Sequence, residues 1–146
     1  ITTGGSLTLG NVAVYTASAY VSRYIQMDAG TLTLNNGSEL MTYGKYGVYQ
    51  TGGDVVMNSG SLIKSMPTTS SISSNTYGIY LSGSTATLTL ESGSMIKDQY
   101  YGIRLAGTNH VEIKDSAVIS YTRYPIEISG AGILNIGKAR LESTNS

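Results

Sequence analysis

Two stretches of this sequence share one twelve-residue pattern, GTLTLNNGSELM at residues 30–41 and ATLTLESGSMIK at residues 86–97. In both, apolar residues alternate with polar ones, a short polar turn with a glycine follows, and a second apolar segment begins. Blurred copies of the pattern precede, separate and follow these two. Such internal similarity is typical of repeat proteins, in which each unit stacks on the next.

The second leucine of the TLTL motif gives the period of the repeat. Six residues align on it, with spacings of 25, 23, 33, 23 and 23: Leu9, Leu34, Met57, Leu90, Ile113 and Ile136. A second motif keeps the same register, and its copies begin at Tyr46, Tyr77, Tyr101 and Tyr124. The repeat unit is therefore about 23 residues long, and one unit carries a large insertion.

Each unit combines short strands with glycine-containing turns. Apolar and polar residues alternate, as in LTL at 32–34 and IYL at 79–81, which is typical of half-buried strands. A further apolar position follows six residues after the anchor, at Leu40, Ile63, Ile96 and Ile119. The turns NNGS at 35–38, NSGS at 58–61 and ESGS at 91–94 contain a glycine, which allows the positive φ of a sharp corner.

Three short strands in a unit of this length cannot enclose a core alone, but stacked units can pair each strand with its copy. The sequence therefore predicts an all-β fold, a right-handed, single-stranded parallel β-helix with five to six rungs of about 23 residues and three short strands per rung. An antiparallel β-sandwich also consists of short strands and tight turns, and it is the alternative. A sandwich does not require a constant period in two motifs.

We expect one β-helix domain over residues 1–146. The insertion is mainly MPTTSSISSN at residues 66–75, which has no strand period and is expected to form a loop outside the stack. Neither end of the sequence contains a capping helix, and an open sheet edge invites pairing. We therefore expect a segment of a longer β-helix, or a chain that packs against a partner through end-to-end contacts of its uncapped rungs.

The composition excludes several classes of partner and site. Nine Lys and Arg balance nine Asp and Glu, so the basic footprint of a nucleic-acid-binding protein is missing. The absence of Cys excludes disulfides, zinc thiolates and cysteine nucleophiles. No apolar run approaches the length of about 18 residues that a membrane span needs, so we expect no membrane span in this segment.

Three stretches resemble the pectin-lyase-like parallel β-helices of bacterial surface proteins, which include autotransporter passengers and other adhesins. They are GTLTLNNGSEL at 30–40, SGSMIKDQYYGIRL at 92–105 and KDSAVIS at 114–120. The resemblance covers nearly the whole chain, and its motifs are structural. It implies a stalk or adhesive module that is extracellular or displayed on the bacterial cell surface, and it transfers no active-site residue.

An enzyme is the alternative, because the same superfold hosts polysaccharide lyases and glycosidases. Glycosidases need two carboxyl groups about 5 to 10 Å apart. The alignment puts Asp98 and Asp115 at different corners and Glu112 and Glu127 on different strands. The four aspartates never share a column, so the acidic cluster of a calcium-dependent lyase is missing. We therefore predict no catalytic residue, no metal site and no cofactor in this segment.

Two further chemistries are weaker. His110 is the only histidine, and its outward position beside Glu112 has no Ser or Cys nucleophile in register, so we expect a solvated surface side chain. A flat face with Thr-x-Thr on successive rungs could order water and so bind ice. Only two of the six outward pairs are of this kind, at residues 31/33 and 87/89, and charged residues interrupt the plane.

The twelve tyrosines are the most suggestive feature for binding. Four share a column and are expected to stack along the rod: Tyr46, Tyr77, Tyr101 and Tyr124. Three fall in the looser turn just before that column, on the side of the 66–75 loop: Tyr43, Tyr100 and Tyr121. An exposed tyrosine offers an apolar ring and a hydroxyl, so we predict at these three a shallow strip that binds a glycan or a host or cell-surface protein.

The sequence thus favours a noncatalytic structural or adhesive module of a secreted or surface-displayed bacterial protein. A fragment of a carbohydrate-active β-helix enzyme, a polysaccharide lyase or a glycosidase, stays the alternative. The register also predicts an outward ion pair between Arg104 and Glu127, one rung apart, which would stabilise the surface by about 0 to 1 kcal/mol.

Overall fold

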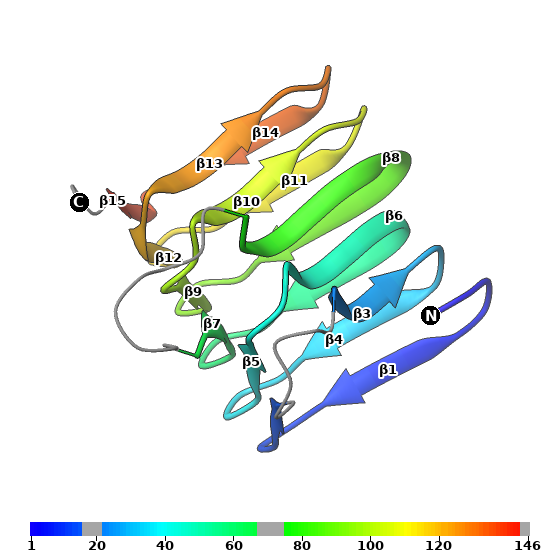
Figure 1. The fold of residues 1–146 in the computed structure, drawn as a ribbon, viewed down its shortest axis with the longest axis horizontal. Coiled ribbons are helices and arrows are strands. Elements are labelled where there is room, and N and C mark those ends of the chain that lie inside the picture. Colours follow the sequence, from blue (N-terminus) through cyan, green and yellow to red (C-terminus); the bar gives the residue numbers. More distant parts are fainter. Residues whose placement is uncertain (16–21, 67–74, 144–146) are drawn as a thin grey trace.

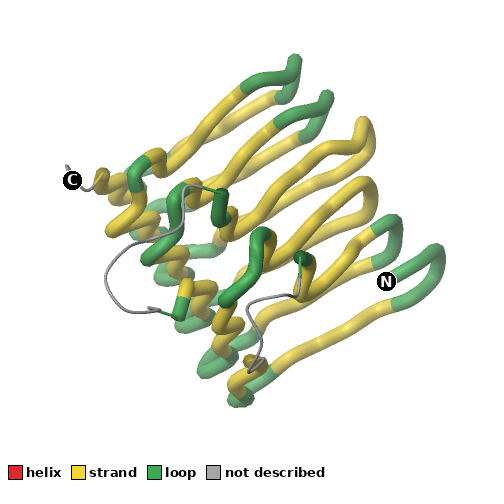
Figure 2. Tube along the Cα trace, in the orientation of Figure 1, coloured by secondary structure: helices red, strands yellow, loops and turns green. Residues whose placement is uncertain are grey.

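The structure is a computed structural model that describes residues 1–15, 22–66 and 75–143. These residues form fifteen β-strands joined by turns and loops, with no helix among them (Figure 2). Figure 1 shows the chain winding in stacked turns from blue to red, with its N- and C-termini at opposite ends of the stack. The stack has about five turns of about 23 residues.

Each turn contributes strands to three faces of the stack. The first face contains the TLTL-type strands β1 (Ser6–Leu9), β4 (Thr31–Leu34), the second half of β6 (Tyr46–Met57), the second half of β8 (Tyr77–Leu90), β11 (His110–Ile113) and β14 (Ile133–Ile136). The second face is a six-stranded sheet of β2 (Ala13–Tyr15), β5 (Glu39–Thr42), β7 (Leu62–Ser65), β9 (Met95–Lys97), β12 (Val118–Thr122) and β15 (Arg140–Ser143). The third face contains β3 (Arg23–Met27), the first halves of β6 and β8, β10 (Tyr101–Leu105) and β13 (Tyr124–Ile128).

The strand register confirms the predicted parallel β-helix. All strand pairs are parallel, and the six TLTL anchors are paired in one column: Leu9, Leu34, Met57, Leu90, Ile113 and Ile136. The YGxY-type motifs pair in the same way from Tyr46 to Tyr124. Each strand therefore lies on its own copy in the adjacent turn, as the repeat period requires.

Two turns differ from the expected three separate strands. In β6 and β8 the strand of the third face continues through the corner into the first face, which joins both faces into one nine-stranded sheet. The corner residues stay in the ladder because Gly52 pairs with Thr85 and Gly53 with Ala86. The register shifts between Gln50 and Gly52, so the ladder is irregular at this corner and regular again from Gly52 onward.

The core is a column of aliphatic layers inside the stack. Inward side chains such as Leu34, Leu40, Ile79 and Ile103 are fully buried, and one cluster of buried residues extends through all the middle turns. Burying one such side chain contributes about 1.5–3 kcal/mol. The sequence contains no Phe and no Trp, and the stacked tyrosine rings are not part of this buried cluster.

The predicted glycine corners between the first and second faces are confirmed. Positive φ values of 74°, 75° and 79° occur at Gly37, Gly60 and Gly93. The serine that follows each glycine is buried, and its hydroxyl donates to the carbonyl oxygen three residues before it at 2.6–2.7 Å: Ser38, Ser61 and Ser94. The corner sequences NNGS, NSGS and ESGS therefore encode a turn in which the buried serine hydroxyl is hydrogen-bonded.

The terminal turns expose what the middle turns bury. The exposed large hydrophobic side chains of the described residues all lie in the first or the last turn: Leu7, Val12, Tyr15, Tyr124, Ile128, Ile133, Ile136 and Leu141. Some occupy inward columns and lack only the neighbouring turn that would cover them. The predicted end-to-end contacts would cover these side chains.

The predicted loop at residues 66–75 lies almost entirely outside the described residues. Only its first and last residues are described, and the Met66 amide donates to the Thr42 carbonyl. Among the described residues, no helix is long and apolar enough to cross a membrane.

Candidate functional site: a tyrosine face

A ladder of stacked tyrosine rings runs along the outside of the third face. The ring centroids are 5.1 Å apart for Tyr46 and Tyr77, 4.8 Å for Tyr77 and Tyr101, and 5.2 Å for Tyr101 and Tyr124. The ring planes deviate from parallel by only 21°, 6° and 17°. The separations are close to the strand spacing of about 4.8 Å, so the predicted stacking of these four residues is confirmed.

A shorter ladder lies beside the first. The rings of Tyr49 and Tyr80 stack at 5.4 Å, and edge contacts at 5.1 and 5.4 Å join them to Tyr46 and Tyr77. Tyr100 packs edge-on against the C-terminal end of the first ladder. We name the outward surface formed by these seven rings the tyrosine face: Tyr46, Tyr49, Tyr77, Tyr80, Tyr100, Tyr101 and Tyr124.

Glycines explain why the two ladders can meet. Strict strand alternation would point Tyr46 and Tyr49, three residues apart, to opposite sides. The two residues between them, Gly47 and Val48, are instead both buried. The Cβ that three glycines of this column lack would lie within 3.3 Å of a core isoleucine methyl group: Gly47, Gly78 and Gly102. Because glycine lets the backbone face the core here, both tyrosines of the motif can point outward.

Arginines close both ends of the shorter ladder. The guanidinium carbon of Arg23 lies 3.9 Å from the ring centroid of Tyr49, and that of Arg104 lies 5.6 Å from the centroid of Tyr80. Arg104 also donates from Nη1 to the Tyr77 hydroxyl at 3.1 Å. Its Nε lies 2.9 Å from a carboxylate oxygen of Glu127, which confirms the predicted ion pair. Cation–π contacts of this kind contribute about 0.5–2 kcal/mol each.

Two more cations lie at the margin of the tyrosine face. The Lys45 ammonium is 5.0 Å from the ring centroid of Tyr46, and the Arg123 guanidinium carbon is 5.4 Å from that of Tyr100. Both cationic side chains are exposed. The hydrogen bond to Tyr46 raises the pKa of Lys45 above its ordinary value, so this ammonium group stays charged at neutral pH.

Burial also affects the tyrosines themselves. Desolvation raises the pKa of Tyr80 and of Tyr101 above the ordinary value of 10.0. Both hydroxyls are therefore protonated at neutral pH and can donate a hydrogen bond. Exposure varies along the main ladder, because Tyr77 in its middle is 5 % exposed and Tyr124 at its end is 43 % exposed. The accessible part of the tyrosine face is thus its outer edge and its C-terminal end.

The three residues of the predicted binding strip take different positions. Tyr100 belongs to the tyrosine face, through its ring contacts with Tyr101 and Tyr124. Tyr43 follows β5 directly, is half-buried, and its backbone amide donates to the Tyr24 hydroxyl. Tyr121 lies within β12, and its side chain is outside the described part of the structure. The strip stays a prediction.

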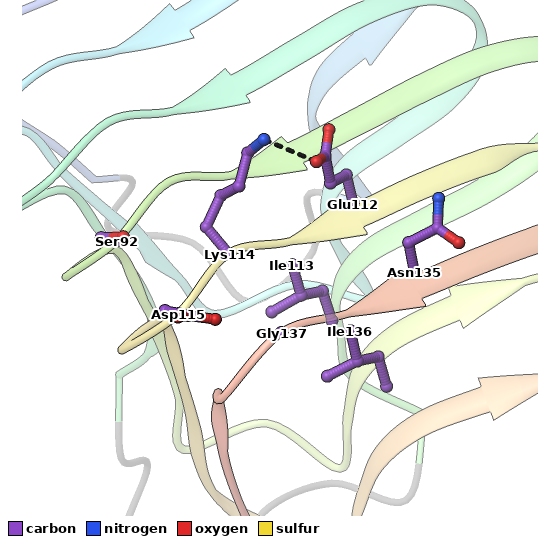
Figure 3. Close-up of a pocket in the computed structure, with 8 residues that line it drawn as sticks. All are labelled: Ser92, Glu112, Ile113, Lys114, Asp115, Asn135, Ile136 and Gly137. Atoms are coloured by element: carbon purple, nitrogen blue, oxygen red, sulfur yellow. Dashed lines mark hydrogen bonds and ion pairs between the residues drawn. The ribbon is translucent and has the colours of Figure 1, made fainter.

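An open hollow lies at the opposite corner of the stack, near the C-terminal turn. Figure 3 shows it lined by residues of β11 and β14 and of the turns that follow β8, β11 and β14, with the Lys114 side chain pointing toward Glu112. This ion pair is 2.5 Å long, and the hydrogen bond to Glu112 raises the pKa of Lys114. Asp115 accepts a hydrogen bond from the Lys138 amide at 2.7 Å. Both carboxylates of the hollow are therefore engaged in surface contacts.

The remaining polar candidates are dispersed. His110 is exposed at the start of β11, between Thr87 and Ile133 of the adjacent turns. The outward residues of the first face pair in the predicted register. For example, Asp54 lies opposite Thr87 and accepts a hydrogen bond from the Thr87 hydroxyl at 2.5 Å. Within the described ranges, no three His, Asp or Glu side chains lie close enough together to hold a metal ion.

Sequence reasoning missed part of this surface. It did not connect Tyr49 and Tyr80 with the main ladder, and it assigned no partner to Arg23, Lys45 or Arg123. A signal was present, because the copies YGVY and YGIY put a glycine between two tyrosines. That glycine breaks the alternation and brings both rings to the same side.

The structure supports the parallel β-solenoid that the resemblance to pectin-lyase-like proteins implied. Comparison of the chain with family models, with curated proteins and with solved structures finds no match.

Proposed function

We propose that this chain is a noncatalytic β-solenoid module of a secreted or surface-displayed bacterial protein, and that its tyrosine face binds a glycan or protein ligand. One observation carries the proposal, namely that seven of the twelve tyrosines gather on one outward surface through mutual ring contacts. Tyrosine combines an apolar ring with a polar hydroxyl and loses little conformational entropy on binding. This surface is therefore suited to ligand binding.

The rigidity of the scaffold supports this role. The rings stand on a parallel sheet in which every strand of the middle turns is paired on both sides. Stacking and the arginine contacts hold the side chains in place before any ligand arrives. A pre-organised surface loses less free energy to ordering when it binds.

The positions of the carboxylates favour a noncatalytic role. Glu112 pairs with Lys114, Glu127 with Arg104, and Asp115 with the Lys138 amide. A glycosidase would need two carboxyl groups facing one sugar across a groove. Surface display rests on the resemblance to bacterial adhesins and is part of the proposal.

A glycan array and a polysaccharide-depolymerisation screen, both with and without calcium, test the proposal on the same purified protein. We expect binding without product, and weaker binding for Tyr100→Ala and Tyr124→Ala. Both residues are on the accessible part of the tyrosine face, and His110→Ala on the first face is the matched control. Product formation would replace this proposal by the enzyme alternative, and binding that neither tyrosine variant changes would place the ligand elsewhere.

A further inference from the structure

The stacking of the main ladder determines which part of each ring a ligand can reach. Tyr77 and Tyr101 are covered on both ring faces by their neighbours along the stack. An aromatic ring is electrostatically negative on its faces and positive at its edge. The ladder hides the negative faces against other rings, so that the outer surface consists of positive ring edges and hydroxyl groups.

The cations of the tyrosine face add to this positive character. Only Arg104 of the four forms an ion pair within the described residues, with Glu127, whereas Arg23, Lys45 and Arg123 form none. Two other carboxylates belong to neighbouring residues, Asp28 beside Gln26 and Asp98 three residues before Tyr101. Four cations thus lie near three carboxylates, and only the Arg104–Glu127 pair is joined by an ion pair.

We propose that the tyrosine face binds an acidic polysaccharide, a sugar chain with carboxylate or sulfate groups. This inference rests on the proposed function and specifies the chemistry of its ligand. Guanidinium, ammonium and phenol groups all donate hydrogen bonds to anionic oxygens, and charge-assisted bonds are the stronger ones. Arg23 and Lys45 lie in the first two turns and Arg104 and Arg123 in the last two, so a linear polyanion along the stack meets cations at both ends.

A nucleic acid fits the same surface less well. Single-stranded nucleic acids are held mainly by stacking of bases on free aromatic faces. In the main ladder, neighbouring rings occupy both ring faces of Tyr77 and Tyr101, and one face each of Tyr46 and Tyr124. The chain also has equal numbers of acidic and basic residues, so it lacks the long-range positive field that attracts nucleic acids.

Three dextrans of equal length test the inference, because they share one backbone and differ in charge: dextran, carboxymethyl-dextran and dextran sulfate. We expect the chain to bind both acidic polymers in biolayer interferometry, at least tenfold more tightly than neutral dextran. Affinity should fall steadily with added salt, since the contacts are ionic. A single-stranded oligonucleotide of equal charge is the comparison ligand.

Two charge variants locate the site. Lys45→Gln and Arg123→Gln change exposed side chains at opposite ends of the face, and each should weaken binding to the acidic dextrans about two- to fivefold. Lys138→Gln, also exposed but directly after Gly137 of the hollow, is the matched control and should leave binding unchanged.

The outcomes separate this inference from the proposed function. Equal binding of neutral and acidic dextran, tighter binding of the oligonucleotide, or the same loss in Lys138→Gln would overturn the acidic-polysaccharide inference. If neutral glycans bind and Tyr100→Ala weakens them, the proposed function stands without it. If the acidic dextrans and the glycan array both give no binding, the glycan part of the proposed function fails with it.

Discussion

The middle and the terminal turns repeat the same pattern, yet the same column is buried in one and exposed in the other. Ile113 in β11 is 1 % exposed, whereas Ile136, its partner one turn later, is 46 % exposed. At the other end, Leu32 is fully buried and Leu7, its partner in β1, is 37 % exposed. An inward side chain is therefore fully buried only when a neighbouring turn covers it on both sides, because its own turn does not shield it from water.

This difference makes stability a property of the interfaces between turns. In stacked repeats the free energy of folding is approximately a sum of terms for each repeat and for each interface between neighbours. A side chain of a middle turn contributes to two interfaces, and one of a terminal turn contributes to one. Matched substitutions in the same column should measure the difference directly.

Truncation of the core column should have the largest effect. Ile113→Ala leaves a cavity between two neighbouring turns and should lower the free energy of unfolding by about 2–5 kcal/mol. Ile136→Ala removes atoms that are already half solvated, so we expect about 1 kcal/mol or less. Denaturant unfolding of both variants measures this, and equal losses would mean that the last turn is covered in solution, for example by another copy.

The tyrosine ladder should show the same gradient with a smaller amplitude. Tyr77 stacks on two rings, contacts a third at its edge and accepts a hydrogen bond from Arg104, so Tyr77→Ala should cost about 2–3 kcal/mol of unfolding free energy. Tyr124 stacks on one ring only, and Tyr124→Ala should cost about 1 kcal/mol.

Thermal unfolding followed by circular dichroism compares the two variants, and Tyr77→Phe is the control that keeps the ring and removes only the hydroxyl. A loss for Tyr124→Ala as large as that for Tyr77→Ala would contradict a ladder built from additive ring pairs.

Added side-chain volume should separate the same two regions. A Cβ at Gly78 would lie 2.7 Å from both the Gly102 carbonyl oxygen and a methyl carbon of Ile96, so Gly78→Ala should destabilise the chain by about 1–3 kcal/mol. At Gly10, in the first turn, the nearest atom would be 3.7 Å away. Gly10→Ala should therefore be neutral or stabilise by up to about 1 kcal/mol. A neutral Gly78→Ala, measured by the same denaturant titration, would refute the close packing between the second and third faces.

The fold could be predicted from the sequence because parallel stacking leaves a direct record in it. Leu34 and Met57 occupy the same position in consecutive repeats because they pair across adjacent turns, so a period read from the sequence is already a strand register. The glycine of the corners NNGS and NSGS was predictable for the same reason, since the local backbone at Gly37 or Gly60 requires a positive φ.

The tyrosine face could be predicted only in part. The column of Tyr46 and Tyr77 followed from the register, but its contact with Tyr49 depends on a break in alternation. The glycine of YGVY was a signal for that break, and the packing of Gly47 against the second face explains it. The contact of Arg23 with the Tyr49 ring depends on the conformation of the long arginine side chain, because Arg23 itself pairs with Tyr46. A strand register does not predict side-chain conformations.

The smallest expected effect is on the ionisation of two tyrosine hydroxyls in the tyrosine face. Their pKa should differ between the folded and the unfolded chain. Burial raises the pKa of Tyr80 and Tyr101, so these phenols should ionise above the ordinary value of 10.0 in the folded protein. Below pH 10 both states keep the proton and this contribution to stability is complete; as the pH rises further, the unfolded chain loses its protons first and the free energy of unfolding falls. Phenolate absorbance should therefore give a titration with a late component, which disappears in denaturant and becomes smaller in Tyr80→Phe. If all tyrosines of the folded chain titrated together near pH 10, water would have to reach the hydroxyl groups of Tyr80 and Tyr101. Such access would contradict the close packing of the rings in the tyrosine face.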